Sequence, residues 1–131
     1  MRSLLRFAPP AFAVLLLTVP FYRTLFFSDR AYFYRDLARD FIPQKALWAQ
    51  AMAAGEGVPY WNLFAMGGVP FYAMNVNAPL HPANFLFLAF GPEEAPRAMV
   101  YYLWVNYALL LCGAYFLLRT LGVGRWPGAM L

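Results

Sequence analysis

Residues 98–118, with the sequence AMVYYLWVNYALLLCGAYFLL, form an apolar stretch that contains no charged residue. A helix that crosses the hydrocarbon core of a bilayer needs about 20 consecutive apolar residues, so this stretch predicts a membrane-spanning helix. A second apolar stretch, residues 7–27, has a similar length and is interrupted only by Arg23. The sequence therefore predicts two spans, with residues 28–97 forming a long loop between them.

The composition of the chain also favours a membrane protein. Of its 131 residues, 63% are hydrophobic and only 12% are charged. A soluble domain of this size has too little interior to hide so much apolar surface. We therefore expect an all-α membrane protein, with two transmembrane helices flanking a long extracytoplasmic loop that contains short interfacial helices.

The N-terminal stretch MRSLLRFAPPAFAVLLLTVPFY has the basic start and apolar centre of a secretory signal. However, no small-x-small cleavage motif closes the apolar run. An uncleaved signal-anchor helix is therefore favoured over a cleaved signal.

The positive charge lies outside the predicted loop and indicates how the chain is oriented. From Arg23 to Arg97, six basic and six acidic residues cancel, and the formal net charge of +4 comes from Arg2, Arg6, Arg119 and Arg125. Because cytoplasmic flanks of membrane helices are rich in Arg and Lys, residues 1–6 and 119–131 are predicted to be cytoplasmic. The basic charge is thereby explained by topology, and no nucleic-acid partner is expected.

The last residues, RTLGVGRWPGAML, combine helix-breaking Gly and Pro with renewed apolar character. This pattern predicts a short cytoplasmic turn followed by the beginning of a third span. We therefore expect the chain to be the N-terminal part of a longer polytopic protein, whose later spans would be its partners.

Within the loop, apolar residues from about Ala31 to Ala54 recur at a broadly helical period. The aromatic side chains among them suit a helix that lies along the membrane surface. Pro43 cannot donate a backbone hydrogen bond, so a kink or break is expected there. Gly55 is well placed to end the helix.

Two acidic residues of this predicted helix, Asp36 and Asp40, lie four positions apart and so on one face. Arg35 and Arg39 form a neighbouring stripe, with Asp36 within reach of Arg39. A carboxylate at the boundary between lipid and water can act as a general base toward a sugar hydroxyl, and arginine can pair with a phosphate. The alternative is a solvated interfacial helix held by ion pairs, which the spacing alone favours.

The segments PYWN and GGVP that follow predict tight turns that carry aromatic and amide side chains. Trp61 offers a flat apolar face of the kind that stacks on sugars, and Asn62 offers an amide donor and acceptor. The competing interpretation is that the aromatics form an interfacial belt and that Asn residues cap turns.

His81 lies between two prolines, ahead of the short apolar run from Phe85 to Phe90. This run is too short to span a bilayer and predicts a re-entrant or interfacial helix with Asn84 as its N-cap. A lone His in such a place is typical of a structural hydrogen bond, and a contact with phosphate is the alternative.

The order of these motifs resembles the N-terminal region of the YfhO-like bacterial membrane proteins, which are similar to GT-C type glycosyltransferases. The motifs are RDL at residues 35–37, GEGVPYWN at 55–62, GGVP at 67–70, HPAN at 81–84 and LLRTLG at 117–122. Each is short, but together they cover nearly the whole chain.

This resemblance implies a function. Enzymes of this type take a sugar from a polyprenyl-phosphate carrier on the extracytoplasmic face of the bacterial cytoplasmic membrane. It implies Asp36 as the catalytic base, with Asp40 as a lower-ranked acid, and leaves a divalent metal cofactor undecided. The acceptor would be a cell-envelope glycan, and the lipid bilayer and a lipid-linked sugar would be the partners.

On that basis Arg35 or Arg39 would contact the carrier phosphate, and Trp61 with Asn62 would shape the sugar pocket. The alternative is a non-catalytic membrane component, either an assembly partner or a lipid-binding scaffold. A transporter is less favoured, because the two spans carry no charged residue except Arg23 near an end.

Overall fold

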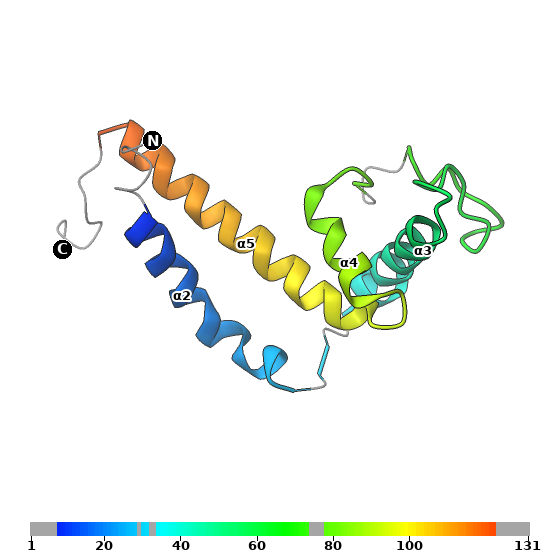
Figure 1. Cartoon of the computed structure of the whole chain (residues 1–131), viewed down its shortest axis with the longest axis horizontal. Helices are drawn as coiled ribbons and strands as arrows, with labels where there is room; N and C mark the ends of the chain where they lie inside the picture. Colours follow the sequence, from blue (N-terminus) through cyan, green and yellow to red (C-terminus); the bar gives the residue numbers. More distant parts are fainter. Residues whose placement is uncertain (1–7, 29, 32–33, 74–77, 123–131) are drawn as a thin grey trace. The chain divides into compact units, whose positions relative to one another are not determined.

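The computed structural model of the chain describes residues 8–28, 30–31, 34–73 and 78–122 (Figure 1). Within these residues the fold is mostly helical and contains no strand, as the sequence predicts. The helices, in chain order, are α2 (Ala8–Phe26), η1 (Leu37–Phe41), α3 (Ile42–Ala53), η3 (Pro82–Asn84), α4 (Phe85–Phe90) and α5 (Ala95–Thr120). The predicted cytoplasmic residues 1–6 and most of the predicted third-span region lie outside the described residues.

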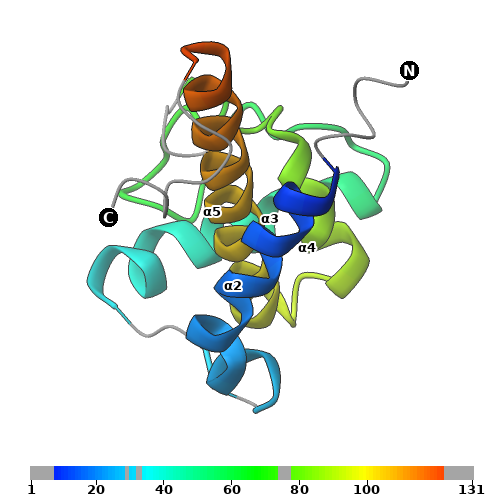
Figure 2. The same ribbon diagram turned by 90° about the vertical axis from the view of Figure 1, so that its left-hand side faces the viewer.

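The chain divides into two compact units. One, which we call the helical pair, contains residues up to Arg23 together with those from Trp104 onward. In it α2 and the later turns of α5 run in opposite directions (Figures 1 and 2). The buried Thr18 hydroxyl accepts a hydrogen bond of 2.8 Å from Trp104 Nε1, which fixes the register of the pair.

Among the described residues, α5 is the one helix that is long and apolar enough to cross a bilayer. It contains the whole of the predicted span 98–118 and extends it by three residues at the start and two at the end. The predicted span 7–27 forms a helix, α2, over nearly its full length. The structure thus confirms one helix of membrane-spanning length and composition.

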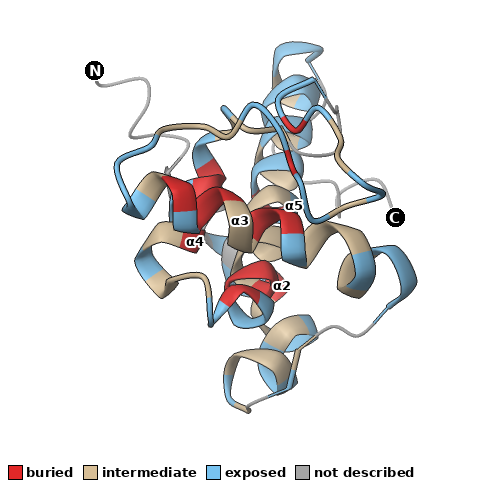
Figure 3. Ribbon diagram, turned by 90° about the vertical axis from the view of Figure 1, so that its right-hand side faces the viewer, coloured by how far each residue is buried: buried red, intermediate tan, exposed pale blue. Residues whose placement is uncertain are grey.

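The second unit, Thr24–Leu103, forms what we call the head, and its apolar core lies between α3, α4 and the first turns of α5 (Figure 3). The core consists of Trp48, Ala49, Phe71, Phe87, Ala95, Ala98 and Met99. Phe85 meets the edge of the Trp48 ring, and Tyr101 stacks on Phe90 with 5.1 Å between the ring centres. The loop between the predicted spans is therefore a folded body with its own interior.

The helical run that precedes α4 begins later than predicted. Residues 35–53 are helical, whereas Ala31 is not. The predicted disruption at Pro43 takes the form of a π-turn, η1, in which the Ile42 N–H donates to Leu37 O. A proline lacks the N–H that an α-helix would use at this point, so the wider turn lets the chain enter α3 with Pro43 in its first turn.

Gly55 ends α3, as predicted. It has φ +76°, a conformation that glycine adopts without the steric cost of a side chain. The Gly55 N–H donates to Met52 O and the Glu56 N–H donates to Ala51 O. This pair of bonds is the Schellman motif, which satisfies the last carbonyls of the helix and turns the chain toward residue 60.

Candidate functional site

The four charged residues singled out at residues 35–40 lie on the π-turn or directly before it. Arg35, Asp36 and Arg39 are exposed, and Asp40 is half-buried. Asp36 occupies the position before η1 but its carboxylate makes no capping hydrogen bond. Its oxygens are therefore not used by the helix and face solvent.

The π-turn changes the predicted relation between Asp36 and Arg39. A turn closed by bonds between residues five apart has more residues per turn than an α-helix. Around the helix axis, the third residue along therefore lies farther from the first residue than it does in an α-helix. No ion pair between these two residues is present in the described part of the head, so the predicted Asp36–Arg39 bridge is not formed.

Trp61 and Asn62 belong to a small hairpin, which we define as residues 60–72. Asn62 and Val69 form an isolated antiparallel bridge, with N–H···O distances of 2.8 and 2.9 Å. The buried Asn62 side chain accepts a hydrogen bond from the Phe64 N–H, which forms an Asx turn. Asn62 therefore shapes the loop, while Trp61 remains 55% exposed and presents an open face.

The Trp61 ring rests on a glycine across the hairpin. A Cβ atom added to Gly68 would lie 2.6 Å from Trp61 Nε1, and Gly68 has φ +119°. Tyr60 and Tyr72 stack at the base of the same hairpin, with 5.9 Å between ring centres. The close approach of ring and backbone explains why glycine stands at position 68.

This packing gives a testable expectation for the hairpin. Gly68→Ala should destabilise the head by roughly 2–4 kcal/mol, because it combines a left-handed backbone penalty with a steric clash. Gly67→Ala is the matched control, since Gly67 also has positive φ but has open space around it. It should cost only about 1–2 kcal/mol. Thermal unfolding of both variants measures the difference, and equal losses would show that Trp61 does not pack on Gly68.

His81 has a structural role in the head. Its Nδ1 accepts a hydrogen bond of 3.3 Å from the Ala83 N–H, which caps the short helix η3. The imidazole also meets the Tyr102 ring edge-on, with 5.8 Å between ring centres. These contacts agree with the structural interpretation of this histidine.

Asn84 holds the N-cap position of α4, as predicted, but its side chain has another role. The side chain makes no capping bond. Instead, the buried Asn84 amide donates to the carbonyl oxygens of Ala78 and Pro79, at 2.8 and 3.2 Å, and its Oδ1 accepts from Lys45 Nζ at 2.8 Å. Burial explains the difference, because an amide inside the head must use all of its hydrogen-bonding groups.

Lys45 is a buried charged residue of the head that the sequence analysis does not single out. It is 2% exposed, and its ammonium group also lies 5.2 Å from the centre of the Tyr102 ring. Burial lowers the pKa of Lys45 to about 8. The signal that points to it in the sequence is its place on the apolar stripe of α3, four residues after Phe41 and three before Trp48.

The lowered pKa makes the stability of the head depend on pH. Unfolded Lys45 binds a proton up to about pH 10.4, whereas the folded residue releases it near pH 8. The unfolded state therefore binds more protons in this window, so stability rises with pH. Between about pH 7.5 and about pH 9.5 the gain should be roughly 2 kcal/mol. Denaturation of the Lys45→Met variant, which should lack this gain, provides the comparison; an identical pH profile would contradict a buried, titrating Lys45.

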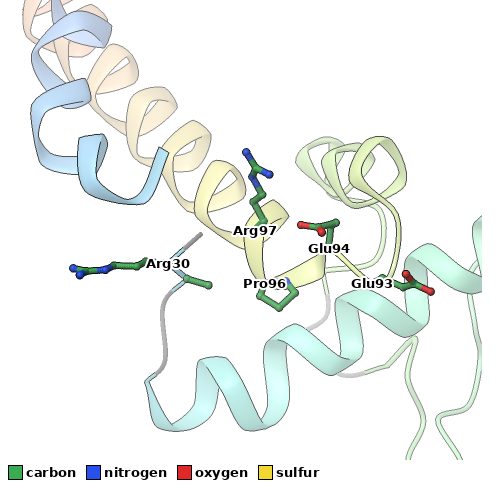
Figure 4. A pocket seen from close by; sticks show the side chains of 6 residues that line it. Arg30, Glu93, Glu94, Pro96 and Arg97 are labelled. Atoms are coloured by element: carbon green, nitrogen blue, oxygen red, sulfur yellow. The ribbon is translucent and has the colours of Figure 1, made fainter. Parts of the chain in front are cut away.

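The predicted site residues do not line the hollow that is described in the head. The hollow of about 290 Å³ in the head is lined by Arg30, Ala31, Glu93, Glu94, Pro96 and Arg97. Figure 4 shows that the Arg30 and Glu93 side chains point away from each other there. None of the seven predicted site residues lines this hollow, and no group of three or more His, Cys, Asp or Glu in the described ranges is placed to hold a metal ion.

Comparisons with known proteins add no assignment. No protein-family model, no curated protein and no solved structure matches this chain. The likeness to the YfhO-like proteins thus rests on the order of the short motifs alone.

Proposed function

We propose that the protein is a multi-pass component of the bacterial cytoplasmic membrane, with α2 and α5 as its first two spans. The length and apolar composition of α5 support insertion, and α2 covers the other apolar stretch. The four arginines at the two ends, Arg2, Arg6, Arg119 and Arg125, account for the net charge of +4, which favours cytoplasmic ends and an extracytoplasmic head.

We further propose that the chain is the N-terminal part of a membrane glycosyltransferase. It would move a sugar from a polyprenyl-phosphate carrier to a cell-envelope acceptor on the extracytoplasmic face. The observation that carries this proposal is the π-turn at Leu37–Phe41, with the solvent-facing carboxylate of Asp36 directly before it. Such turns within helices occur frequently at functional sites.

In this proposal Asp36 takes the proton of an acceptor hydroxyl. The acceptor oxygen then bonds to the anomeric carbon of the sugar, and the bond between that carbon and the carrier phosphate breaks. A base of this kind contributes about 10²–10⁴-fold to the rate. Arg35 or Arg39 would pair with the departing phosphate, since guanidinium binds phosphate through two parallel hydrogen bonds.

The remaining predicted residues have roles that follow from their contacts. The exposed face of Trp61 would stack on the sugar, and Asn62 would act by holding the turn next to Trp61. Asp40 is half-buried on the same π-turn and is the second acidic candidate. His81 would support the fold near Tyr102.

The experiment is a transfer assay in membranes that contain the whole protein, with any chain that follows Leu131. A polyprenyl-phosphate sugar labelled in the sugar is the donor, and transfer of label to envelope glycan is measured. Failure of the wild-type protein to transfer label from any tested carrier, with the protein correctly inserted, would contradict the proposal.

The second candidate is a non-catalytic membrane assembly or lipid-binding component. It is favoured by the exposed apolar side chains of the hairpin, which suit contact with lipid or protein better than contact with sugar. This candidate would be supported if a protein with Ala at Asp36, Trp61 and Asn62 together still performed its role in the cell.

A further inference from the structure

The hairpin divides its apolar side chains between the interior of the head and solvent. Phe71 is 1% exposed and belongs to the core, and Val58, just before the hairpin, packs against that core. At the tip, by contrast, Leu63, Phe64 and Met66 are 73%, 89% and 90% exposed. The head is therefore folded around the base of the hairpin, and the tip is left outside.

The tip is held in this position by backbone contacts. The Asn62–Val69 bridge closes the loop, and the Gly68 N–H donates to Ala65 O at 2.7 Å. Met66 has φ +50°, a left-handed conformation that a side chain adopts at a steric cost. The apolar tip is thus a defined turn, and the chain accepts a strained residue to form it.

The chemistry around the tip indicates what it contacts. Residues 57–80 include no charged side chain and no histidine. Beside the tip, Tyr60 and Trp61 are exposed, and aromatic residues with one polar atom are enriched where protein meets the edge of a bilayer. Protein-binding surfaces usually carry Arg among their aromatic residues, and here no such charge is present.

We propose that the hairpin tip, Leu63, Phe64 and Met66, inserts into the interfacial layer of a lipid bilayer. The head is covalently continuous with α5, so a membrane that holds α5 is always close to it. Exposed apolar area removed from water drives the insertion, and Tyr60 and Trp61 lie at the level of the headgroups. This inference does not depend on glycosyl transfer.

The test places a fluorescent label at the tip without removing any of its three apolar side chains. In the whole protein, Cys112→Ala, together with replacement of any cysteine that follows Leu131, removes the native thiols, and Ala65→Cys accepts an environment-sensitive dye. Glu56→Cys, an exposed position at the end of α3, carries the same dye as a matched control. Both proteins are reconstituted into phosphatidylcholine vesicles that contain lipids with a nitroxide near the headgroup.

The dye at position 65 should be quenched by the lipid nitroxide and show a blue-shifted emission, whereas the dye at 56 should be quenched only by a water-soluble nitroxide. Adding anionic lipid should not change this result, because the segment is uncharged. Phe64→Ser with Met66→Ser should abolish the lipid quenching. The unfolding temperature of the head should not change, since both side chains are exposed.

Three outcomes would overturn the proposal. Quenching at 65 by the aqueous nitroxide alone would show that the tip stays in water. Protection from both quenchers would show that a protein surface, such as a second copy of the chain, covers it. Quenching that requires anionic lipid would show that charges elsewhere bring the head to the membrane.

Discussion

Replacing Asp36 by Asn is expected to reduce glycosyl transfer by about 10²–10⁴-fold, the contribution of a positioned general base. Asn has nearly the same shape but cannot take a proton from the acceptor hydroxyl. Asp36 makes no capping hydrogen bond and is exposed, so the change should leave the fold and membrane insertion intact. Transfer from a labelled polyprenyl-phosphate sugar measures the effect, with protein level and unfolding temperature recorded in parallel.

Asp40→Asn is the matched control for this experiment. It makes the same chemical change four residues along, on the same π-turn, at a half-buried position. A loss confined to Asp36 would identify this carboxylate as the base. If Asp36→Asn retained full transfer and Asp40→Asn lost it, the roles would be exchanged. If neither variant lost activity, neither carboxylate would be the base.

Replacing Asn84 by Leu should destabilise the head by about 3–5 kcal/mol, because it removes a buried hydrogen bond to a charged group and the donor of two carbonyl oxygens. Leu has a similar volume but cannot accept the hydrogen bond of Lys45 or donate to the carbonyls of Ala78 and Pro79. The ammonium of Lys45 would then be left buried beside an apolar side chain. Chemical denaturation in detergent, monitored by hydrogen exchange of the amides of the head, measures the loss of stability.

A double-mutant cycle separates the Lys45–Asn84 bond from the rest of the effect. Lys45→Met removes the buried charge, so Asn84→Leu should cost about 1.5–3 kcal/mol less in that background. Gln44→Met is the control at the neighbouring position, because Gln44 Oε1 is buried and has no hydrogen-bond partner among the described residues. It should be neutral or stabilising. Additive losses in the cycle would mean that the two side chains do not interact.

The parts of the fold that the sequence predicts well are those governed by local rules. The length of the charge-free stretch within α5 is enough to predict that helix. The freedom of Gly55 to adopt positive φ is enough to predict the end of α3. The short helix at Phe85–Phe90 follows from a bounded apolar run. Each of these features is determined by neighbours along the chain.

The parts that the sequence misses depend on residues far apart in the chain. Asn84 holds the N-cap position of α4, but its side chain bonds to Lys45, 39 residues earlier, and does not cap the helix. The sequence shows Lys45 only as one charge among those of the loop, because its burial depends on Asn84 and Tyr102, which lie against it. The part that Asn62 plays in the loop likewise depends on its bridge to Val69. Tertiary partners decide these roles, and local patterns do not contain them.

The Lys45–Asn84 bond has a consequence for the timing of synthesis. A ribosome adds about 5–20 residues per second, so Asn84 is made roughly 2–8 s after Lys45. During that interval the nascent α3 carries a lysine whose later buried place does not yet exist. The ammonium must stay hydrated until residues 78–84 arrive, so the head cannot close early around its own first half. Ala95, Ala98 and Met99 of α5 belong to the same core, so closure of the head also waits for the first turns of α5.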